Sequence, residues 1–346
     1  MQRLTIAGRL LITALILGGL YAGYKYLGGE KLLKKSAEEA KIEATTTTAP
    51  SSESSSTMPS SESSAPADNA ASDVASDRPS FNYTPESPVD GKLKGVVELG
   101  ASGFNSFIVR IDKQKRWKLE KAEFGNSLVL ENMASDEDVR GGLKKYIGNM
   151  LDFGVGGRDI HFVVSSGALK APETQKILKG LKSLNYVVNT VTPEQEGKFG
   201  LKSVMPDGFK TTAFVVDIGS GNTKISWVDN GKMSSVETYG SKYFQNSVDD
   251  ATVASEVSAK SKQIPSANRK TCFIIGGVPF ELAKAVRNGK ERYTVLDAPS
   301  AYKLDNAKSK AGLNIYKAVR EATGCEQFVF DWDANFTIGV LLDLPQ

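Results

Sequence analysis

The sequence predicts a duplicated, two-lobed α/β fold with a ligand cleft between its halves, behind an N-terminal membrane helix and a disordered linker. Three observations predict this organisation: a charge-free apolar segment near the N-terminus, a long tract rich in Ser, Thr, Ala, Pro and acids, and two apolar runs that each end in an acid–glycine turn. Beyond the tract, strand and helix patterns alternate, which is typical of α/β domains. A chain of 346 residues has room for one or two such domains.

Residues 10–27 are expected to form a single transmembrane anchor, preceded by a short tail, residues 1–9. The first part of this segment, residues 10–24, carries no charge, and a cation flanks it on each side. It is shorter than the ~20 residues that a spanning helix prefers, but flanking cations can snorkel and tyrosines suit the membrane interface. A signal peptide cleaved near Ala22 is the alternative. Because basic residues lie on both sides of the segment, charge leaves open which side of the membrane the rest of the chain occupies.

Residues 28–90 are expected to be a charged segment followed by a disordered tether. Residues 30–41 have the composition of a short charged helix, and residues 45–88 are dominated by Ser, Thr, Ala, Pro and acids. Such a composition cannot bury enough apolar surface to become ordered. We therefore expect the folded part to comprise lobe I, residues 91–210, and lobe II, residues 211–346, with a C-terminal segment that could return to lobe I.

Strand and helix patterns alternate throughout the folded part. Apolar residues at helical spacing predict helices around residues 139–151 and 177–184, and a third helix at 314–322 that Gly324 closes. Strands are expected at residues 94–98, 106–112, 160–165, 186–191, 213–217, 224–228, 271–275 and 327–330.

The two acid–glycine turns are the most informative local feature. The first turn is Glu98-Leu99-Gly100-Ala101-Ser102-Gly103, and the second is Asp217-Ile218-Gly219-Ser220-Gly221-Asn222-Thr223. In each, an apolar run ends in a carboxylate, and small residues then let the backbone turn tightly enough to aim N–H groups at a phosphate. A new strand follows each turn, so we expect hairpins rather than the strand-to-helix turns of Rossmann or Walker sites.

Composition argues against several classes of function. A net charge of +3 gives no strong attraction to nucleic acid, and none is expected as a partner. Cys272 and Cys325 are too few for a disulfide framework and do not have the spacing of metal ligands. Cys272 lies in an apolar run and is expected to be a buried thiol. The single histidine, His161, lies in a predicted strand, which disfavours Ser-His-Asp chemistry.

Four motifs occur in a distinctive order. They are ELG at residues 98–100, VVSSGAL at 163–169, VTPEQEG at 191–197 and VDIGSGNT at 216–223. In this order and spacing the chain resembles the exopolyphosphatase / guanosine pentaphosphate phosphatase family, which belongs to the superfamily of actin, sugar kinases and chaperone ATPases. The resemblance runs from about Lys94 to Leu342, with IGG at 275–277 as a third glycine turn. It implies a duplicated ribonuclease-H-like fold, the actin-like ATPase fold.

The resemblance implies hydrolysis of a phosphoanhydride, with polyphosphate or a guanosine polyphosphate as substrate and Mg²⁺ as cofactor. Glu98 and Asp217 match the two acids that hold the metal in this superfamily. Glu196 matches the general base that orients and deprotonates the attacking water. The positions that match the phosphate-binding loops are Gly100, Ser102, Gly103, Gly219, Gly221, Asn222, Thr223, Gly276 and Gly277.

Two positions depart from the family pattern. Glu98 stands where the first motif usually begins with Asp, which adds one methylene to a metal ligand. Lys224 stands at the end of the second turn, where hydrolytic members usually carry Glu. Lys224 is therefore either a direct phosphate contact or the mark of lost hydrolysis with anion binding retained.

Glu196 also has a structural interpretation. Thr192 and Pro193 are typical of an N-cap and a first helical residue, which places Glu196 in the first turn of a helix. Two functions are therefore carried forward: a membrane-tethered phosphoanhydride hydrolase, which Glu196 favours, and a catalytically degenerate binding protein that senses or scaffolds, which Lys224 favours. The sequence leaves open whether the chain forms a homodimer.

Overall fold

The computed structural model describes residues 80–100, 103–124, 136–169 and 172–345. The expected membrane anchor, most of the expected tether, and Ser102 lie outside these ranges. Within the described ranges, no helix has the length and apolar character needed to cross a bilayer. The chain divides into two compact units, Met1–Val74 and Ala75–Gln346, and all of the described residues belong to the second.

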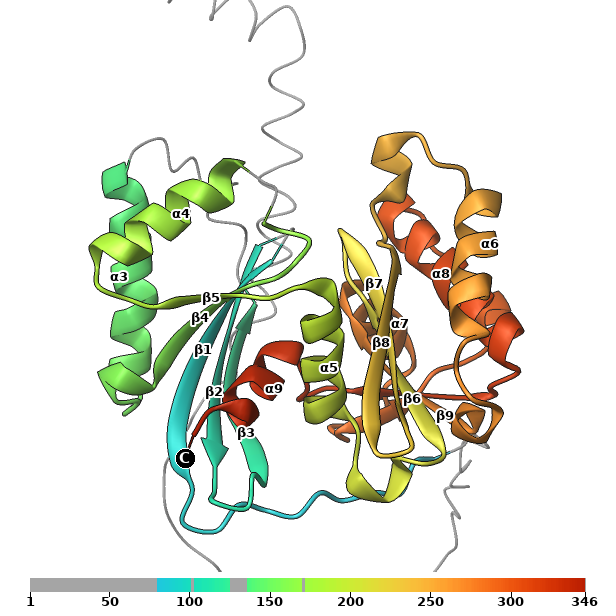
Figure 1. Cartoon of the computed structure of the whole chain (residues 1–346), viewed down its shortest axis with the longest axis horizontal. Helices are drawn as coiled ribbons and strands as arrows, with labels where there is room; N and C mark the ends of the chain where they lie inside the picture. The colour runs from blue at the N-terminus through green and yellow to red at the C-terminus, as the bar shows by residue number, and fades with distance from the viewer. Residues whose placement is uncertain (1–79, 101–102, 125–135, 170–171, 346) are drawn as a thin grey trace, which may run out of the picture. The chain divides into compact units, whose positions relative to one another are not determined.

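Two mixed sheets form the framework of this unit (Figure 1). The first sheet has the order β3-β2-β1-β4-β5, and its strands are β1 (Lys92–Gly100), β2 (Gly103–Ile111), β3 (Trp117–Phe124), β4 (Ile160–Val164) and β5 (Val188–Thr190). The second sheet has the order β10-β11-β9-β6-β7-β8. Its strands are β6 (Ala213–Ile218), β7 (Asn222–Asp229), β8 (Lys232–Tyr239), β9 (Thr271–Gly276), β10 (Tyr293–Val295) and β11 (Gln327–Asp331).

The two sheets repeat one topology. In each, an antiparallel meander is followed by parallel strands that add beside its first strand. The order 3-2-1-4-5 of the first sheet recurs as 8-7-6-9-11 in the second, and β10 is added at the edge. The predicted two-sheet α/β architecture is confirmed, and the repeated order shows the duplication. We call the part around the first sheet lobe I and the part around the second sheet lobe II.

Helices flank both sheets. In lobe I, α3 (Asp136–Asp152) packs against α4 (Pro172–Ser183), and in lobe II, α8 (Ala307–Thr323) packs against α6 (Asp250–Ser261) and α7 (Gly277–Val286). Two further helices, α5 (Pro193–Val204) and α9 (Phe336–Asp343), pack against each other. The short 3₁₀ helices are η1 (Gly157–Asp159), η2 (Asp207–Phe209), η3 (Tyr243–Asn246), η4 (Ser266–Arg269) and η5 (Pro299–Ala301).

The helix pair α5–α9 lies between the two sheets (Figure 1). Helix α5 packs on β6, β7 and β8, whereas α9 packs on β1 and β2 although it follows the last strand of lobe II. Phe336 and Leu341 of α9 are buried against Val96 and Phe107 of the first sheet. This arrangement brings the C-terminal segment beside the first acid–glycine turn.

The segment before β1 is attached to both lobes. The ring of Phe81 packs edge-on against Phe273 of β9, with 5.5 Å between centroids. Further along, the backbone N–H of Val89 donates to Asp112 Oδ2 at 3.0 Å, at the end of the β2 strand. The sequence predicts a tether that extends to residue 90, and in the structure these contacts join its last ten residues to the folded unit.

Candidate functional site

A cavity of about 360 Å³ lies between the lobes, where β1 and β6 end. Residues from both acid–glycine turns, from α5 and from the start of α7 line it. The predicted site residues among its lining residues are Glu98, Gly100, Glu196, Asp217, Gly219, Gly221, Asn222, Lys224, Gly276 and Gly277. The duplicated hairpins face each other across the cavity. This arrangement brings together predicted site residues that lie as many as 179 positions apart in the sequence.

Three predicted phosphate contacts are not placed in the cavity. Ser102 lies outside the described residues, and Gly103 begins β2 without lining the cavity. Thr223 is fully buried on β7, between Asn222 and Lys224, which do line the cavity. Because side chains alternate along a strand, Thr223 points to the opposite face of the sheet. Its Oγ1 has no hydrogen-bond partner among the described residues.

Glu196 is positioned by the first turn of α5. Thr192 Oγ1 accepts from the backbone N–H of Gln195, and the Gln195 side chain accepts from the N–H of Thr192, which confirms the predicted N-cap as a capping box. The next residue, Gly197, lies against β8, where a Cβ would meet Ser235 Oγ at 1.9 Å. The glycine thus permits the close approach of α5 that buries Glu196.

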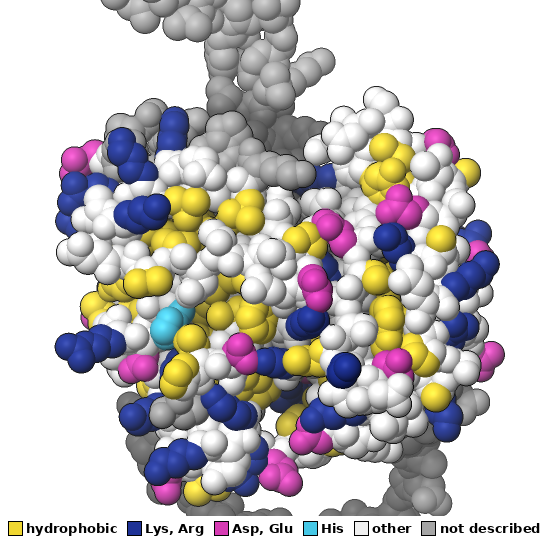
Figure 2. Space-filling model, in the orientation of Figure 1, with side chains coloured by type: hydrophobic (Ala, Val, Ile, Leu, Met, Phe, Trp, Pro, Cys, Tyr) yellow, Lys and Arg dark blue, Asp and Glu magenta, His cyan; other side chains and the backbone are white. Residues whose placement is uncertain are grey.

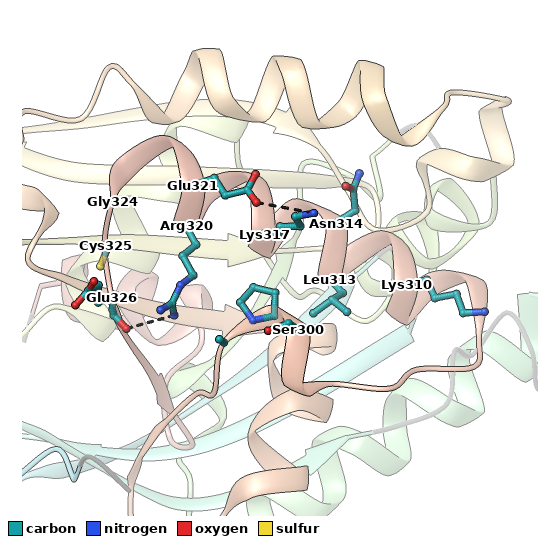
Figure 3. A pocket seen from close by; sticks show the side chains of 12 residues that line it. Ser300, Lys310, Leu313, Asn314, Lys317, Arg320, Glu321, Gly324, Cys325 and Glu326 are labelled. Carbon is teal, nitrogen blue, oxygen red and sulfur yellow. Dashed lines mark hydrogen bonds and ion pairs between the residues drawn. The ribbon is translucent and has the colours of Figure 1, made fainter.

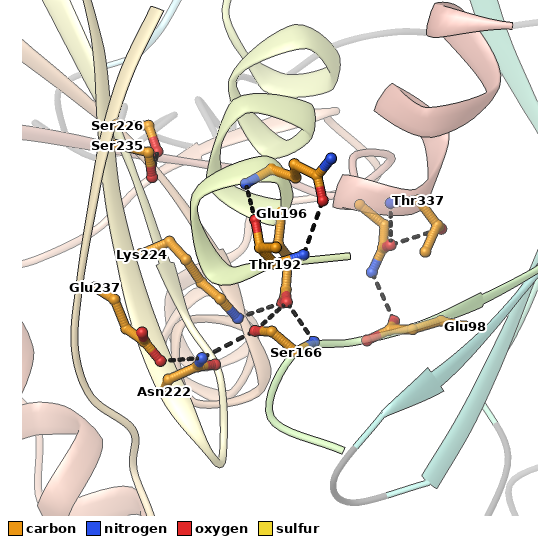
Figure 4. Close-up of polar contacts among 12 residues, drawn as sticks. Glu98, Ser166, Thr192, Glu196, Asn222, Lys224, Ser226, Ser235, Glu237 and Thr337 are labelled. Atoms are coloured by element: carbon orange, nitrogen blue, oxygen red, sulfur yellow. Dashed lines mark hydrogen bonds and ion pairs between the residues drawn. The ribbon is translucent and has the colours of Figure 1, made fainter. Parts of the chain in front are cut away.

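A buried polar network surrounds Glu196 (Figure 4). Lys224 Nζ forms an ion pair with Glu196 Oε1, and the two side chains are each only 3% exposed. The backbone N–H and the hydroxyl of Ser166 donate to Glu196 Oε2 at 2.8 and 2.6 Å. Asn222 Nδ2 extends the network by donating to Ser166 Oγ at 2.9 Å and to Glu237 Oε1 at 2.6 Å.

This network occupies both carboxylate oxygens of Glu196. A general base needs an oxygen that can accept a proton from a water within hydrogen-bond reach. Here an ammonium pairs with one oxygen and two donors from Ser166 meet the other, so three of the about four acceptor sites of the carboxylate are engaged. Glu196 lies in the first turn of a helix, as its structural interpretation predicts, and it also borders the cavity. Its role as a general base stays a prediction.

Glu98 is the acid of the first turn. Asn105 Nδ2 and Asn335 Nδ2 both donate to Glu98 Oε2, each at 3.0 Å. Burial raises the pKa of Glu98 to about 7, and the negative charges of Glu196 and Asp217 act in the same direction, whereas the two amide hydrogen bonds lower it. The carboxyl is partly exposed to the cavity and shielded from bulk water.

Asp217 is the acid of the second turn. Burial raises the pKa of Asp217 to about 6; the ammonium of Lys224 lowers it, and the carboxylate of Glu196 raises it. Lys224 lies directly opposite Asp217 in the β6–β7 ladder. The three carboxyl groups therefore crowd one end of the cavity, and Lys224 places its positive charge among them.

The donor set fits a magnesium ion that keeps most of its water. No cluster of three or more His, Cys, Asp or Glu side chains in the described ranges could enclose a metal. Mg²⁺, however, is commonly bound by one or two carboxylates together with water and substrate phosphates. Glu98 and Asp217 offer such a pair, and a divalent cation beside them would stabilise the ionised forms that burial disfavours.

The third glycine turn opens the N-terminus of α7 toward the cavity. Gly276 has φ 112°, and a Cβ there would lie 2.3 Å from the carbonyl oxygen of Ile218, so only glycine fits between β9 and β6. Lys308, in the first turn of α8, places its Nζ within 3.5 Å of the position that a Cβ on Gly277 would occupy. A helix N-terminus beside an ammonium favours an anion.

Several polar residues of the site were not predicted, among them Ser166, Asn105, Asn335 and Lys308. Ser166 lies within the VVSSGAL motif at residues 163–169, but its position in the sequence did not show that its hydroxyl would donate a hydrogen bond to Glu196. Asn105 and Asn335 reach Glu98 from β2 and from the start of α9, which are 230 residues apart. Lys308 is one of many lysines, and no local pattern distinguishes it.

Other features flagged in the sequence lie away from the cavity. Cys272 is buried and His161 is half-buried on β4, as expected, and Cys325 is buried as well; both cysteines are free thiols. Basic and acidic side chains are interspersed over the face shown in Figure 2. A second cavity, of about 600 Å³, lies along α8 in lobe II and contains no predicted site residue (Figure 3).

Solved structures of similar fold are exopolyphosphatases and related enzymes. The PPX-GPPA enzyme of Aquifex aeolicus aligns with a TM-score of 0.56 and 16% identity over 73% of this chain and 99% of its own. An exopolyphosphatase from Cytophaga hutchinsonii aligns with a TM-score of 0.58 and 13% identity over 73% of this chain and 98% of its own. No family model and no curated protein matches the chain.

These alignments support the actin-like fold that the sequence predicts. They span nearly the full length of both enzymes, so the described unit corresponds to their whole architecture rather than to one lobe. At 13–16% identity they show the fold alone. What the cavity does must be argued from its own residues.

Proposed function

We propose that the interlobe cavity binds the phosphate groups of a phosphoanhydride, either inorganic polyphosphate or a guanosine polyphosphate. We further propose that the protein binds this ligand without hydrolysing it. The observation that carries the proposal is the buried ion pair between Lys224 and Glu196. It engages the one carboxylate that the family resemblance assigns to the base. The fold likeness to exopolyphosphatases supports a phosphate chain as the ligand.

The phosphate groups would meet the glycine turns and nearby cations. The turn at Gly219–Gly221 and the N-terminus of α7 supply N–H groups, and Lys308 supplies positive charge beside Gly277. Glu98 and Asp217 would hold Mg²⁺, which would neutralise phosphate charge and so allow an anionic ligand to lie beside two carboxylates.

Hydrolysis is the second candidate, and the Glu98 carboxyl favours it. With a pKa of about 7, Glu98 would be partly ionised at neutral pH and could accept a proton from water. Glu98 also borders the cavity, and it comes from β1 in lobe I, whereas Lys224 comes from β7 in lobe II. A hydrolase of this kind would use Glu98, and not Glu196, as its base, and it would hold Mg²⁺ through Asp217, water and the substrate phosphates instead of through Glu98.

Binding and phosphate release, measured on the same samples, separate the two candidates. We expect the full-length chain to bind polyphosphate or guanosine pentaphosphate in the presence of Mg²⁺, seen as heat in a calorimetric titration, without release of phosphate above the protein-free rate. Glu196→Gln is expected to retain binding, because Gln still accepts from Ser166 and the ammonium of Lys224, freed from its partner, adds positive charge to the cavity. Glu321→Gln, an exposed glutamate on α8, is the matched control.

Different outcomes point to different assignments. Release of phosphate that Glu196→Gln reduces by about 10²- to 10⁴-fold would establish Glu196 as a base and refute the binding proposal. Release that Glu98→Gln abolishes while Glu196→Gln spares it would support the second candidate. An absence of binding by every phosphate ligand would refute both.

We also propose that residues 10–27 tether this unit to a membrane. The proposal rests on the uncharged apolar sequence with its flanking cations. Fractionation should recover the full chain with membranes after washing at high salt and high pH. A reporter fused after Gln346 and active on only one side of the membrane would assign the side that the folded unit occupies, and recovery of the chain in the wash would refute the tether.

A further inference from the structure

One wall of the interlobe cavity is aromatic. Its aromatic lining residues are Phe107, Phe124, Phe280, Phe330, Trp332 and Phe336. Phe107, Phe330 and Phe336 are buried parts of the core, but Phe124 on β3 is 65% exposed and Phe280 on α7 is 37% exposed. Large rings that remain exposed within a cavity commonly mark a ligand surface.

The exposed rings form a continuous surface rather than isolated contacts. The ring of Phe280 lies 6.1 Å from that of Phe124, which comes from the other lobe, and 5.3 Å from the indole of Trp332. The guanidinium of Arg287 lies 3.7 Å from the centre of the Trp332 ring and fixes it by a cation–π contact. The indole of Trp332 is therefore held in place before any ligand binds.

This aromatic wall adjoins the phosphate-binding turns. Phe280 follows Gly277 by three residues on α7, which is about 4.5 Å along the helix axis at 1.5 Å per residue. The ammonium of Lys308 also lies near Gly277, 3.5 Å from the position that a Cβ there would occupy. If a phosphate of the ligand lies at the α7 N-terminus, the group attached to that phosphate lies within reach of the Phe280 ring.

The chemistry of the wall distinguishes the two ligands that the proposed function leaves open. Inorganic polyphosphate is charged along its whole length and gains nothing from apolar rings. A nucleobase has a flat apolar face that stacks on aromatic side chains, and its triphosphate could extend to the glycine turns. A volume of about 360 Å³ lies within the usual range for small-molecule sites.

We propose that Phe280, with Phe124 and Trp332, forms a stacking subsite for the base of a nucleoside polyphosphate, so that the cavity selects a nucleotide over inorganic polyphosphate. This proposal rests on the proposed phosphate-binding function and assigns its ligand class. Phe280 is a specificity-determining residue in this arrangement, and Lys308 serves both ligands through their phosphates.

A matched pair of ligands tests the subsite. GTP and inorganic tripolyphosphate carry similar phosphate chains, but only GTP has a base. Calorimetric titration of the full-length protein with Mg²⁺ should show GTP binding at least tenfold more tightly. Phe280→Ala should weaken GTP binding by about 5- to 160-fold, the range expected for losing one base–aromatic stack, and leave tripolyphosphate binding within about twofold. Phe280→Tyr should retain GTP binding.

The chain supplies a matched control for Phe280→Ala. Phe244 on η3 has nearly the same exposure, 38%, and does not line the cavity, so Phe244→Ala should change neither affinity. Lys308→Gln should weaken both ligands by a similar factor, because it removes a phosphate contact. Quenching of Trp332 fluorescence by GTP and not by tripolyphosphate, lost in Trp332→Phe, would place the base at the aromatic wall.

Three outcomes would overturn the proposal. Equal affinities for GTP and tripolyphosphate that Phe280→Ala leaves unchanged would eliminate the subsite while the proposed function stands. Equal weakening of both ligands by Phe280→Ala would show that the contact between Phe280 and Phe124 holds the lobes together instead of receiving a base. Failure of the wild-type protein to bind either ligand would refute the proposed function together with the subsite.

Discussion

The two acid–glycine hairpins share a topology and differ in the residue opposite the acid. In lobe I, Glu98 on β1 pairs with Asn105 on β2, and in lobe II, Asp217 on β6 pairs with Lys224 on β7. Opposite residues of an antiparallel ladder face the same side of the sheet. The first acid is therefore held by neutral amides, whereas the second faces an ammonium.

This single difference gives the two halves different electrostatics. Burial raises the pKa of both acids by similar amounts, from 4.5 to about 7 for Glu98 and from 3.8 to about 6 for Asp217. Amide hydrogen bonds oppose the rise in lobe I, and the ammonium of Lys224 opposes it in lobe II. Lys224 also pairs with Glu196, which comes from α5 between the sheets. A duplicated fold thus supplies two equivalent positions, and the residue across each hairpin decides whether a neutral amide or an ammonium acts on its acid.

The largest expected effect comes from removing the ammonium of lobe II. Lys224→Met leaves the Glu196 carboxylate buried without a cation, and breaking a buried ion pair in this way costs about 3–5 kcal/mol of unfolding free energy. The equivalent change in lobe I, Asn105→Met, removes one hydrogen bond to Glu98 and should cost about 1 kcal/mol. Urea unfolding of both variants at one pH compares the two hairpins directly.

A double variant checks the physical cause of that loss. Lys224→Met combined with Glu196→Met replaces both charges by apolar groups of similar length, which often restores stability in buried pairs. We expect the double variant to recover at least half of the loss seen in Lys224→Met. Should Lys224→Met prove no more destabilising than Asn105→Met, the ion pair would not be the main difference between the hairpins.

The second prediction makes lobe I resemble lobe II. Asn105→Lys would place an ammonium opposite Glu98, and a nearby opposite charge lowers a carboxyl pKa by about 1–3 units. The pKa of Glu98, about 7 in the native chain, should fall accordingly. Carboxyl ¹³C NMR in the presence of a chelator measures it, and Asn105→Gln, which keeps a neutral amide, is the control.

The same substitution should change the dependence of stability on pH. The folded-state pKa of Glu98 lies above the ordinary value of 4.5, so the unfolded chain loses this proton first as pH rises. The contribution of Glu98 to stability is therefore complete below about pH 4.5 and is lost as pH rises to about 7. Asn105→Lys should flatten this decline between about pH 4.5 and about pH 7, and an unchanged decline would show that another group causes it.

The hairpins were predictable because their signals are local. An apolar run, an acid and closely spaced glycines specify the end of β1 and the end of β6 without reference to the rest of the chain. The N-cap of α5 at Thr192 and the closing glycine of α8, Gly324 with φ 67°, were predictable for the same reason.

Elements that depend on distant partners were not predicted. Strand β8 contains Met233, Ser234, Ser235 and Val236 without a regular apolar alternation, and its pairing with β7 defines it. Helix α9 is almost wholly apolar, so its sequence has no polar face from which a helical period could be recognised. Its apolar side chains are buried against the first sheet.

The site was predictable as a set of acids and glycines, and not as a network. The pairing of Lys224 with Glu196 requires α5 to lie against β7 and β8, and the contact of Gly197 with Ser235 that permits this spans 38 residues. The family resemblance identified Lys224 as a departure, but only the fold shows which acid its ammonium meets. The aromatic wall likewise combines residues from β3, α7 and the end of β11.

The smallest expected effect tests how lobe I holds its acid from outside the hairpin. Asn335 Nδ2 donates to Glu98, while Asn335 Oδ1 caps α9 by accepting from the N–H and hydroxyl of Thr337 at 2.9 and 2.7 Å. Asn335→Ser retains an N-cap acceptor, so stability should change by only a few tenths of a kcal/mol. It removes one of the two hydrogen bonds that lower the pKa of Glu98, so that pKa should rise by less than about one unit. Carboxyl NMR of Asn335→Ser beside Asn335→Ala separates the two roles, because only the alanine variant should also lose the cap, at a cost of about 1 kcal/mol. A Glu98 pKa that falls or stays constant in both variants would mean that Asn105 alone holds the acid, and that the contact with α9 contributes only to the helix.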